Sequence, residues 1–461
     1  MYFFYSLLLT LGFVALLPRF AIDAMRSGKY VTGLRQRLGR LPAINRTGKQ
    51  IIWLHCVSVG ETQAAQSLVR ALRIEFPKHC LAVSTTTVTG QQVARKLFAN
   101  DAALVFYFPI DLAWVVRRVL QAVQPSAVLI METELWPRLL HECRARTIPV
   151  ALLNGRISET SFRRYKLIRP FMGRMLNDLT VALMQSEKDA ARIRELGLPG
   201  ERIALPGNLK FDSAETAIDG RVTAELRRRF GFDATRPLIV AASTHTPEER
   251  ITIEAVKQMN SDQRGRTRLL IAPRHPERFG EVGSLLEDSG LSWSRRSAEP
   301  GEPDKSCDVV LLDTVGELRA VYPLAQIVFV GGSIATHGGH NMLEPAATGA
   351  CVITGPHTEN FAAITKALLD EGALIQLPEG SASDAPTQLV SVLKELLSDE
   401  ARRREMGLHA REVCKHNAGA TARTMRMLSP ILSQTTMADA ASPLSTLSVT
   451  AAKLIALQSS R

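Results

Sequence analysis

Several protein classes are excluded by what this 461-residue chain lacks. It has only six cysteines, no C-x-x-C pair, and no D-x-D or G-K-[ST] sequence. So few and so widely spaced cysteines exclude a disulfide-stapled secreted domain and the usual zinc sites, and they fit a reducing compartment. The missing G-K-[ST] excludes a Walker loop. The missing D-x-D excludes one common pair of aspartates that binds a divalent cation. Any phosphate bound here must therefore be met by Arg, Lys and helix termini.

The composition is that of a folded protein with an uneven charge distribution. Hydrophobic residues make up 46% of the chain, and 56 Lys and Arg stand against 45 Asp and Glu. The length predicts two or three domains. Two stretches carry the positive excess: residues 18–50 hold eight bases and one acid, and residues 156–174 hold six bases and one acid. Such stretches are either solvated faces or surfaces that bind anionic partners.

The first 17 residues contain no charge, and the basic stretch follows at once. As a helix they would extend roughly 25 Å, the short limit for crossing a bilayer. Bases after an apolar run do not fit a secretory signal, and by the positive-inside tendency they keep the body of the protein in the cytoplasm. We expect an N-terminal membrane anchor that either spans the bilayer or lies in its interface. The alternative is an N-terminal helix docked on the domain.

From residue 51 onward, short apolar runs alternate with helical patterns, which predicts parallel sheets covered on both faces. The expected strands lie at 51–57, 80–85, 102–107, 126–131, 149–153, 180–184, 237–242, 267–272, 308–312, 326–330, 351–353 and 372–376. The expected helices of the first half lie at 61–75, 89–98, 111–123, 134–145 and 186–196, and helical sequence at 386–432 closes the second half. Two doubly wound α/β domains follow, with a ligand expected in a cleft between them.

Two acidic motifs directly follow expected strands. Glu61, in S-V-G-E, would open a helix at the carboxyl edge of the sheet, where an ionised carboxylate suits a general base. Its alternative is an ordinary first-turn residue that satisfies free N–H groups. Glu132 and Glu134, in M-E-T-E-L-W-P, are two carboxylates that suit charge stabilisation or polyol binding. The alternative there is a helix N-terminus with Thr133 as its cap.

A glycine-rich segment from Gly331 to Glu344 follows the strand at 326–330. Its glycines would let backbone N–H groups approach a phosphate, with Glu344 accepting hydrogen bonds from a ribose. His337 and His340 are a weak metal pair, because no further ligand stands at a usual spacing. Arg274, at the end of another strand, can clamp a phosphate, and Lys210, near the domain boundary, can reach a leaving-group phosphate.

These motifs together resemble one family. An uncharged N-terminus followed by V-S-V-G-E, M-E-T-E-L-W-P, N-G-R-I-S, G-N-L-K-F-D, A-P-R-H-x-E-R and H-G-G-H-N-x-L-E-P is similar to the 3-deoxy-D-manno-octulosonic acid (Kdo) transferases of lipopolysaccharide synthesis, over residues 1–425. The resemblance implies a GT-B inverting glycosyltransferase with two Rossmann-like domains. It also implies CMP-Kdo as donor, a lipid A precursor as acceptor, and no metal or other cofactor.

The resemblance also implies residue roles. Glu61 is the expected base, and Glu132 and Lys210 are the expected transition-state stabilisers. The expected CMP contacts are Pro273, Arg274, Val315, Gly316, Glu317, Asn341, Met342, Leu343 and Glu344. The expected organisation is an anchor and basic segment at 1–30, an acceptor domain at 31–212, a CMP-sugar domain at 213–433 and a tail at 434–461. The basic stretches, with Arg163, Arg164 and Lys166, would then face acceptor phosphates or anionic lipids of a bacterial inner membrane, with the domains on its cytoplasmic side.

Three other functions remain as alternatives. A GT-B transferase or epimerase that uses a different nucleotide sugar has the same architecture, and inhibition by CMP but not UDP would exclude it. A two-domain sugar-binding protein would need secretion, which a retained anchor opposes. Nucleic-acid binding rests on the net charge alone, without basic motifs that are interleaved with aromatic residues, and we do not expect it.

Overall fold

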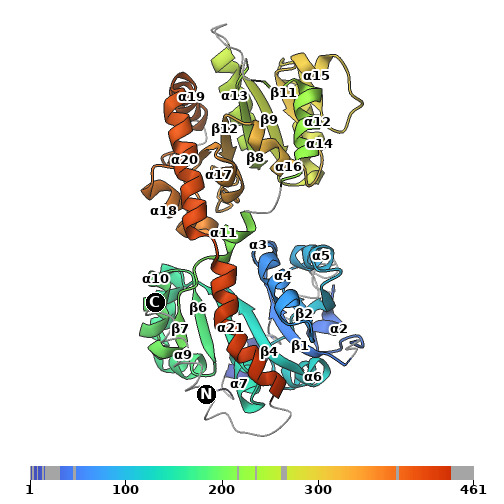
Figure 1. Cartoon of the computed structure of the whole chain (residues 1–461), viewed down its shortest axis with the longest axis vertical. Coiled ribbons are helices and arrows are strands. Elements are labelled where there is room, and N and C mark those ends of the chain that lie inside the picture. Colours follow the sequence, from blue (N-terminus) through green and yellow to red (C-terminus); the bar gives the residue numbers. More distant parts are fainter. Residues whose placement is uncertain are drawn as a thin grey trace. The chain divides into compact units, whose positions relative to one another are not determined.

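The computed structural model of the chain describes residues 2, 5–7, 9–12, 15, 32–44, 48–214, 218–233, 236–260, 267–380 and 384–437. The chain divides into two compact units (Figure 1). The first comprises residues up to 213 and from 419 onward, and the second comprises residues 214–418. Over the described residues, each unit contains one seven-stranded sheet whose paired strands are all parallel. The predicted α/β class is therefore confirmed.

The sheet of the first unit has the strand order β3-β2-β1-β4-β5-β6-β7. Its strands are β1 (Gln50–His55), β2 (His79–Thr85), β3 (Ala102–Tyr107), β4 (Pro125–Met131), β5 (Val150–Gly155), β6 (Val181–Met184) and β7 (Ile203–Ala204). The chain winds outward in one direction from β1 and then in the other from β4. The point between β1 and β4 is a topological switch, where ligands of such sheets bind at the carboxyl ends of the strands.

Helices cover both faces of this sheet because alternate residues of each strand point to opposite sides. In β1, Ile51 and Trp53 join one apolar core, and Ile52 and Leu54 join the other. The helices are α2 (Leu34–Arg37), α3 (Val59–Ala64), α4 (Gln66–Glu75), α5 (Val88–Leu97), α6 (Ala113–Val123), α7 (Pro137–Ala145), α8 (Glu159–Leu167), α9 (Arg169–Leu176), α10 (Glu187–Glu195), α11 (Leu209–Ala214) and α21 (Ala420–Met437).

Helix α21 returns to the first unit from the far end of the sequence and lies beside α4 (Figure 1). Met425, Leu428, Ile431 and Leu432 complete one of its two cores. The carboxylate of Asp212 accepts hydrogen bonds from the backbone N–H groups of residues 419 and 421, the first of them at 2.7 Å. The expected second domain ran on to residue 433, whereas the structure assigns residues 419–433 to the first unit.

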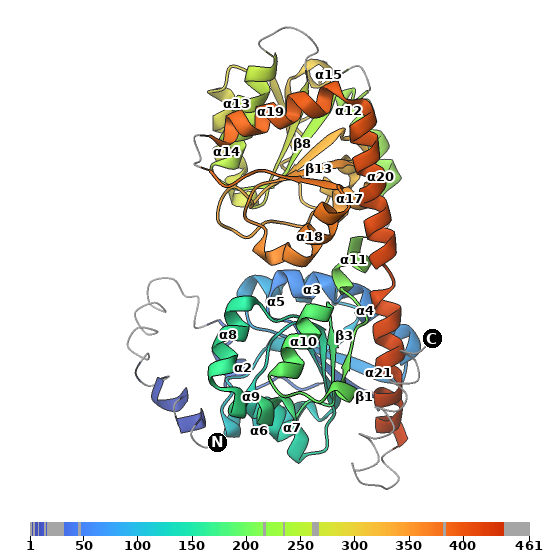
Figure 2. The ribbon, with the colours of Figure 1, turned by 90° about the vertical axis from the view of Figure 1, so that its left-hand side faces the viewer.

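The second unit repeats this topology with the order β10-β11-β9-β8-β12-β13-β14. Its strands are β8 (Leu238–Thr244), β9 (Arg268–Pro273), β10 (Trp293–Arg295), β11 (Val309–Leu311), β12 (Ile327–Val330), β13 (Cys351–Thr354) and β14 (Leu374–Gln376). Its helices are α12 (Gly220–Phe230), α13 (Glu248–Asn260), α14 (Phe279–Glu287), α15 (Pro303–Ser306), α16 (Leu318–Val321), α17 (Leu343–Thr348), α18 (Ala362–Asp370), α19 (Ala385–Ser398) and α20 (Glu400–Asn417). Figure 2 shows α19 and α20 following one another along this unit. Its switch point lies between β8 and β12.

All twelve expected strands are present, and the short strands β7 and β10 were not predicted. None of the helices in the described ranges has both the length and the apolar character needed to cross a membrane, and residues 1, 3, 4, 8, 13, 14, 16 and 17 of the expected anchor lie outside those ranges. Of the first 17 residues, Tyr5 donates a hydrogen bond to Asp111 at 3.0 Å, and Ser6 accepts one from Arg138 at 2.6 Å. The basic residues of 18–31 and the tail from 438 lie outside the described residues.

Candidate active site

Glu61 lies in the first turn of α3, at the carboxyl end of β1. Ser58 caps this helix, its hydroxyl accepting a hydrogen bond from the N–H of Glu61 at 3.4 Å. The Glu61 carboxylate in turn accepts from the Val57 N–H at 2.8 Å and from the Ser58 hydroxyl at 3.1 Å. This is close to a capping box, so the alternative of a first-turn residue describes part of what Glu61 does.

The Glu61 side chain is buried, unlike that of an ordinary capping residue on a protein surface. The residue is only 7% exposed. Burial, and after it the negative charge of Glu132, raise the pKa of Glu61 to about 8. An exposed capping glutamate would have its pKa lowered by the helix N-terminus instead. A carboxyl group that titrates close to neutral pH is matched to proton transfer.

Glu132 directly follows β4, across the switch point from Glu61. Its φ of +54° is in the left-handed region, which is costly for a glutamate and is typical of functional sites. One carboxylate oxygen, Oε1, lies 2.9 Å from Nζ of Lys210, and the other, Oε2, lies 2.7 Å from Nε of Arg156. The structure thus brings the three expected catalytic residues to one edge of the first unit and adds Arg156 to them.

The loop after β4 differs from one alternative of the sequence analysis. Helix α7 begins at Pro137 with Trp136 at its N-cap position, so Thr133 caps no helix. The Thr133 hydroxyl instead donates to the carbonyl oxygen of Arg156, which ties the ends of β4 and β5 together. Burial and Glu132 raise the pKa of Glu134, which lies in the same loop.

Asn154, near the end of β5, holds the helix that carries Lys210. Its side-chain oxygen accepts a hydrogen bond at 2.9 Å from the N–H of Leu209, the first residue of α11. Its φ is +52°, a conformation that asparagine tolerates better than most residues. Sequence reasoning missed both Asn154 and Arg156 as site residues, although the N-G-R-I-S motif that contains them was the available signal.

In the second unit, the expected phosphate loop binds an anion of the protein's own. The two carboxylate oxygens of Glu248, which is fully buried, accept from the N–H groups of His245, Gly332, Ser333 and Ile334 at 2.7–3.0 Å. A Cβ on Gly331 would lie 2.5 Å from Glu248 Oε2, so this glycine makes room for the carboxylate. The expectation that these N–H groups receive a phosphate was wrong for residues 332–334.

The expected CMP contacts lie on three loops of this unit. Pro273 is buried at the end of β9, and Arg274 after it is exposed. Val315 is 72% exposed beside Gly316, and Glu317 binds Arg296 with N–O distances of 2.8 and 3.0 Å.

The last four expected contacts stand at the start of α17. Glu344 lies 2.8 Å from Arg319 and accepts from Asn341 at 3.2 Å. The side chains of Met342 and Leu343 are fully buried. These two residues therefore have only their backbone to offer a ligand.

The expected basic patch lies on α8, where Arg163, Arg164 and Lys166 are all exposed. Two of the charges have acidic partners: Arg163 lies 3.2 Å from Glu159, and Lys166 lies 2.6 Å from Glu195. The patch is therefore less positive than its sequence indicates.

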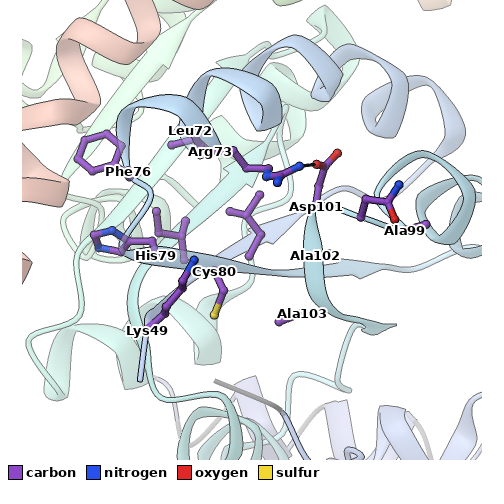
Figure 3. A pocket seen from close by; sticks show the side chains of 13 residues that line it. Lys49, Leu72, Arg73, Phe76, His79, Cys80, Ala99, Asp101, Ala102 and Ala103 are labelled. Atoms are coloured by element: carbon purple, nitrogen blue, oxygen red, sulfur yellow. Dashed lines mark hydrogen bonds and ion pairs between the residues drawn. The ribbon is translucent and has the colours of Figure 1, made fainter. Parts of the chain in front are cut away.

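A cavity of about 250 Å³ opens at the other end of the first sheet (Figure 3). Lys49, His79 and Ala102, at the starts of β1, β2 and β3, line it together with the ion pair of Arg73 and Asp101. It lies at the amino ends of the strands, opposite to Glu61 and Glu132. Among the described residues, no group of three or more His, Cys, Asp or Glu side chains is arranged to hold a metal ion.

The comparisons with known proteins place the chain among one group of relatives. The family described as 3-deoxy-D-manno-octulosonic-acid transferase (kdotransferase) matches residues 32–213. The 3-deoxy-D-manno-octulosonic acid transferase of Haemophilus influenzae is 34% identical over 93% of this chain and 98% of its own length. The enzyme of the same name from Bordetella pertussis is 37% identical over 82% of this chain and 86% of its own.

Solved structures extend the likeness to the fold. A putative UDP-N-acetylglucosamine 2-epimerase from Listeria monocytogenes aligns over 84% of this chain and 97% of its own, with a TM-score of 0.55 and 16% identity. At that identity the likeness shows the fold alone and carries no information about the reaction. With both relatives matched over most of their length at more than 30% identity, the chain belongs to the 3-deoxy-D-manno-octulosonic acid transferase family, a family of glycosyltransferases.

Proposed function

We propose that this enzyme transfers Kdo from CMP-Kdo to a hydroxyl group of a lipid A precursor, with inversion at the anomeric carbon. The observation that carries the mechanism is the buried Glu61 beside Glu132 at the switch point of the first sheet. Family membership supports Kdo as the transferred sugar.

Glu61 acts as the general base in this proposal. As the acceptor oxygen bonds to the anomeric carbon of Kdo, its proton passes to the Glu61 carboxylate, and the bond from that carbon to the CMP phosphate breaks. The hydrogen bonds from Val57 and Ser58 fix the carboxylate in one orientation. Each of its oxygens has two lone pairs, so one remains for the proton. A positioned base of this kind contributes about 10²- to 10⁴-fold to a rate.

Lys210 and Arg156 provide positive charge close to the base. Both are held by the single carboxylate of Glu132, so their positions are fixed before substrate binds. We propose that they stabilise negative charge on the reacting donor, either its carboxylate or its phosphate. Glu132 acts in this scheme mainly by holding the two cations.

We also propose that the acceptor approaches from the cytoplasmic side of a bacterial inner membrane. Leu167 and Ile168, 84% and 48% exposed, adjoin the exposed bases of α8. Apolar side chains beside bases suit the interface of an anionic membrane.

The direct test compares Glu61→Gln with wild type in single-turnover Kdo transfer and in CMP binding. We expect transfer to fall about 10²- to 10⁴-fold while CMP binding persists. The matched control is Glu201→Gln, an exposed glutamate of the same unit. Turnover within tenfold of wild type would remove Glu61 from the role of base, and inhibition by UDP but not CMP would point to another donor.

A further inference from the structure

Four histidine rings meet at the switch point of the second sheet, and the proposed mechanism does not use them. His245 follows β8, His275 follows β9, and His337 and His340 lie in the loop after β12. The ring of His245 stacks on that of His337 with centroids 4.1 Å apart and on that of His340 at 5.0 Å, and it meets His275 edge-on at 5.2 Å. We call these four residues the histidine cluster.

The centre of the histidine cluster is an uncharged, hydrogen-bonded pair. Nε2 of His245 lies 2.8 Å from Nε2 of His340. Burial, together with the neighbouring cationic groups, lowers the pKa of His245 to about 4 and that of His340 to about 3. Both rings are therefore neutral at neutral pH, and the Nε2–H group of one ring donates a hydrogen bond to Nε2 of the other. The ring of His340 is also packed tightly against Gly332, where an added Cβ would lie 2.7 Å from it.

The charges around the cluster favour an anion over a metal ion. The guanidinium of Arg278 is bound by Glu249 and Glu281, whereas within the described ranges no carboxylate pairs with Arg274. The carboxylate of Glu248 beneath the cluster is already occupied by four N–H groups. Glu277, which is exposed, lies 3.7 Å from Nδ1 of His275. In the described part of the chain, Arg274 thus has no carboxylate partner, and it lies beside imidazole N–H donors that can bind an anion.

The fold places this arrangement where a ligand is expected. In doubly wound sheets, ligands bind outside the carboxyl ends of the strands at the switch point, here between β8 and β12. His337 and His275 are exposed, while His245 is buried behind them. Ser243, which leads into His245, has a φ of +55°, a strained conformation that functional sites often retain.

We propose that the histidine cluster, with Arg274, binds the phosphate of the nucleotide donor. His275, His337 and Arg274 contact the phosphate, and the buried His245, which is hydrogen-bonded to the half-buried His340, holds His337 in place by ring stacking. This inference rests on the proposed function and deepens it by assigning the phosphate position in the second unit. Imidazole N–H groups bind the departing phosphate as hydrogen-bond donors, without adding a carboxylate that would repel it.

The experiment measures the dissociation constants of CMP and cytidine, which differ by the phosphate alone, for wild type and for His337→Ala and His275→Ala. Loss of a hydrogen bond to a charged group is expected to weaken CMP binding about tenfold and to leave cytidine binding unchanged. His409→Ala, an exposed histidine on α20, is the control and is expected to change neither constant. Both replaced side chains are exposed, and equal melting temperatures will show that the variants are folded.

Each outcome decides a different question. Unchanged CMP binding in both variants, or equal weakening of CMP and cytidine, overturns the phosphate assignment while the proposed function stands. If wild type binds UMP but not CMP, the proposed donor itself is wrong. A selective loss for CMP in either variant supports the assignment.

Discussion

Nζ of Lys210 lies 2.9 Å from Oε1 of Glu132, and this ion pair joins the first turn of α11 to the end of β4. Both side chains are largely buried, 13% and 9% exposed. Arg156 occupies the other oxygen of the same carboxylate. A buried carboxylate that holds two cations can prepare positive charge at a site before any substrate arrives.

The first prediction concerns this ion pair. Glu132→Gln and Lys210→Met are each expected to lower kcat about 10²-fold, as the loss of one stabilising group does in other active sites. Because the two residues act as a unit, the kcat of the double variant is expected to be only slightly lower than the kcat of the less active single variant. Losses that multiply would show that the residues act independently. The control is the exposed pair of Lys366 and Asp370, whose removal is expected to leave kcat unchanged.

The second prediction concerns pH. The base must be ionised, and the pKa of Glu61 is raised to about 8. We expect kcat/KM to rise about tenfold per pH unit below pH 8 and to level off above it. The measurement is a profile from pH 6 to 9 with wild type. A profile already flat at pH 6 would contradict the raised pKa.

An independent readout of the same pKa is stability. The folded state keeps the Glu61 proton up to about pH 8, whereas the unfolded chain loses it near 4.5. Stability therefore falls as pH rises between these values, and the loss is complete above about pH 8. The Glu61→Gln variant carries no such charge. Its Tm is expected to match wild type at pH 5 and to exceed it at pH 9.

The third prediction concerns Glu248. An amide in its place leaves one acceptor oxygen for four N–H groups and turns a donor toward two of them. We expect Glu248→Gln to destabilise the second unit by about 2–4 kcal/mol, measured by urea unfolding of the full chain. Glu287→Gln, at an exposed position of α14, is the control. Equal stability of the two variants would mean that the loop does not depend on this carboxylate.

The fourth prediction concerns the basic patch of α8. Replacing Arg163, Arg164 and Lys166 with Gln is expected to raise the KM for the lipid acceptor about tenfold and to leave the KM for CMP-Kdo unchanged. The effect is modest because two of the charges already have glutamate partners. The matched control replaces three exposed arginines of α12 in the second unit, Arg221, Arg227 and Arg228. An unchanged acceptor KM would mean that the patch is a solvated face.

Much of the fold was predictable because buried parallel strands are short apolar runs between helical patterns. Strands β7 and β10 were not, since Ile203–Ala204 is too short and Trp293–Arg295 is too polar to show such a run. The amphipathic pattern of α21 predicts a helix but does not specify which sheet it covers. Only the contacts of Asp212 and of the apolar residues of α21 show that it belongs to the first unit.

The positions of Glu61 and Glu132 were predictable because a motif places each of them directly after a strand, whereas Lys210 was expected beside them only from the resemblance. The site was not predictable where the partner is distant in sequence. Glu248 accepts a hydrogen bond from Gly332, which is 84 residues further along the chain, and His245 is hydrogen-bonded to His340, which is 95 residues further along. In the same way, the sequence showed Arg156 only as one of the six bases in residues 156–174, and the structure shows that it forms an ion pair with Glu132.

The central claim is that this chain transfers Kdo from CMP-Kdo to a lipid A precursor with Glu61 as base. The most direct test incubates wild type and Glu61→Gln with CMP-Kdo and a tetraacylated lipid A precursor and weighs the lipid by mass spectrometry. The account predicts one or more added Kdo residues with wild type, release of one CMP per Kdo, and essentially unmodified lipid with the variant. Unmodified lipid with wild type, or equal product with both proteins, would contradict it.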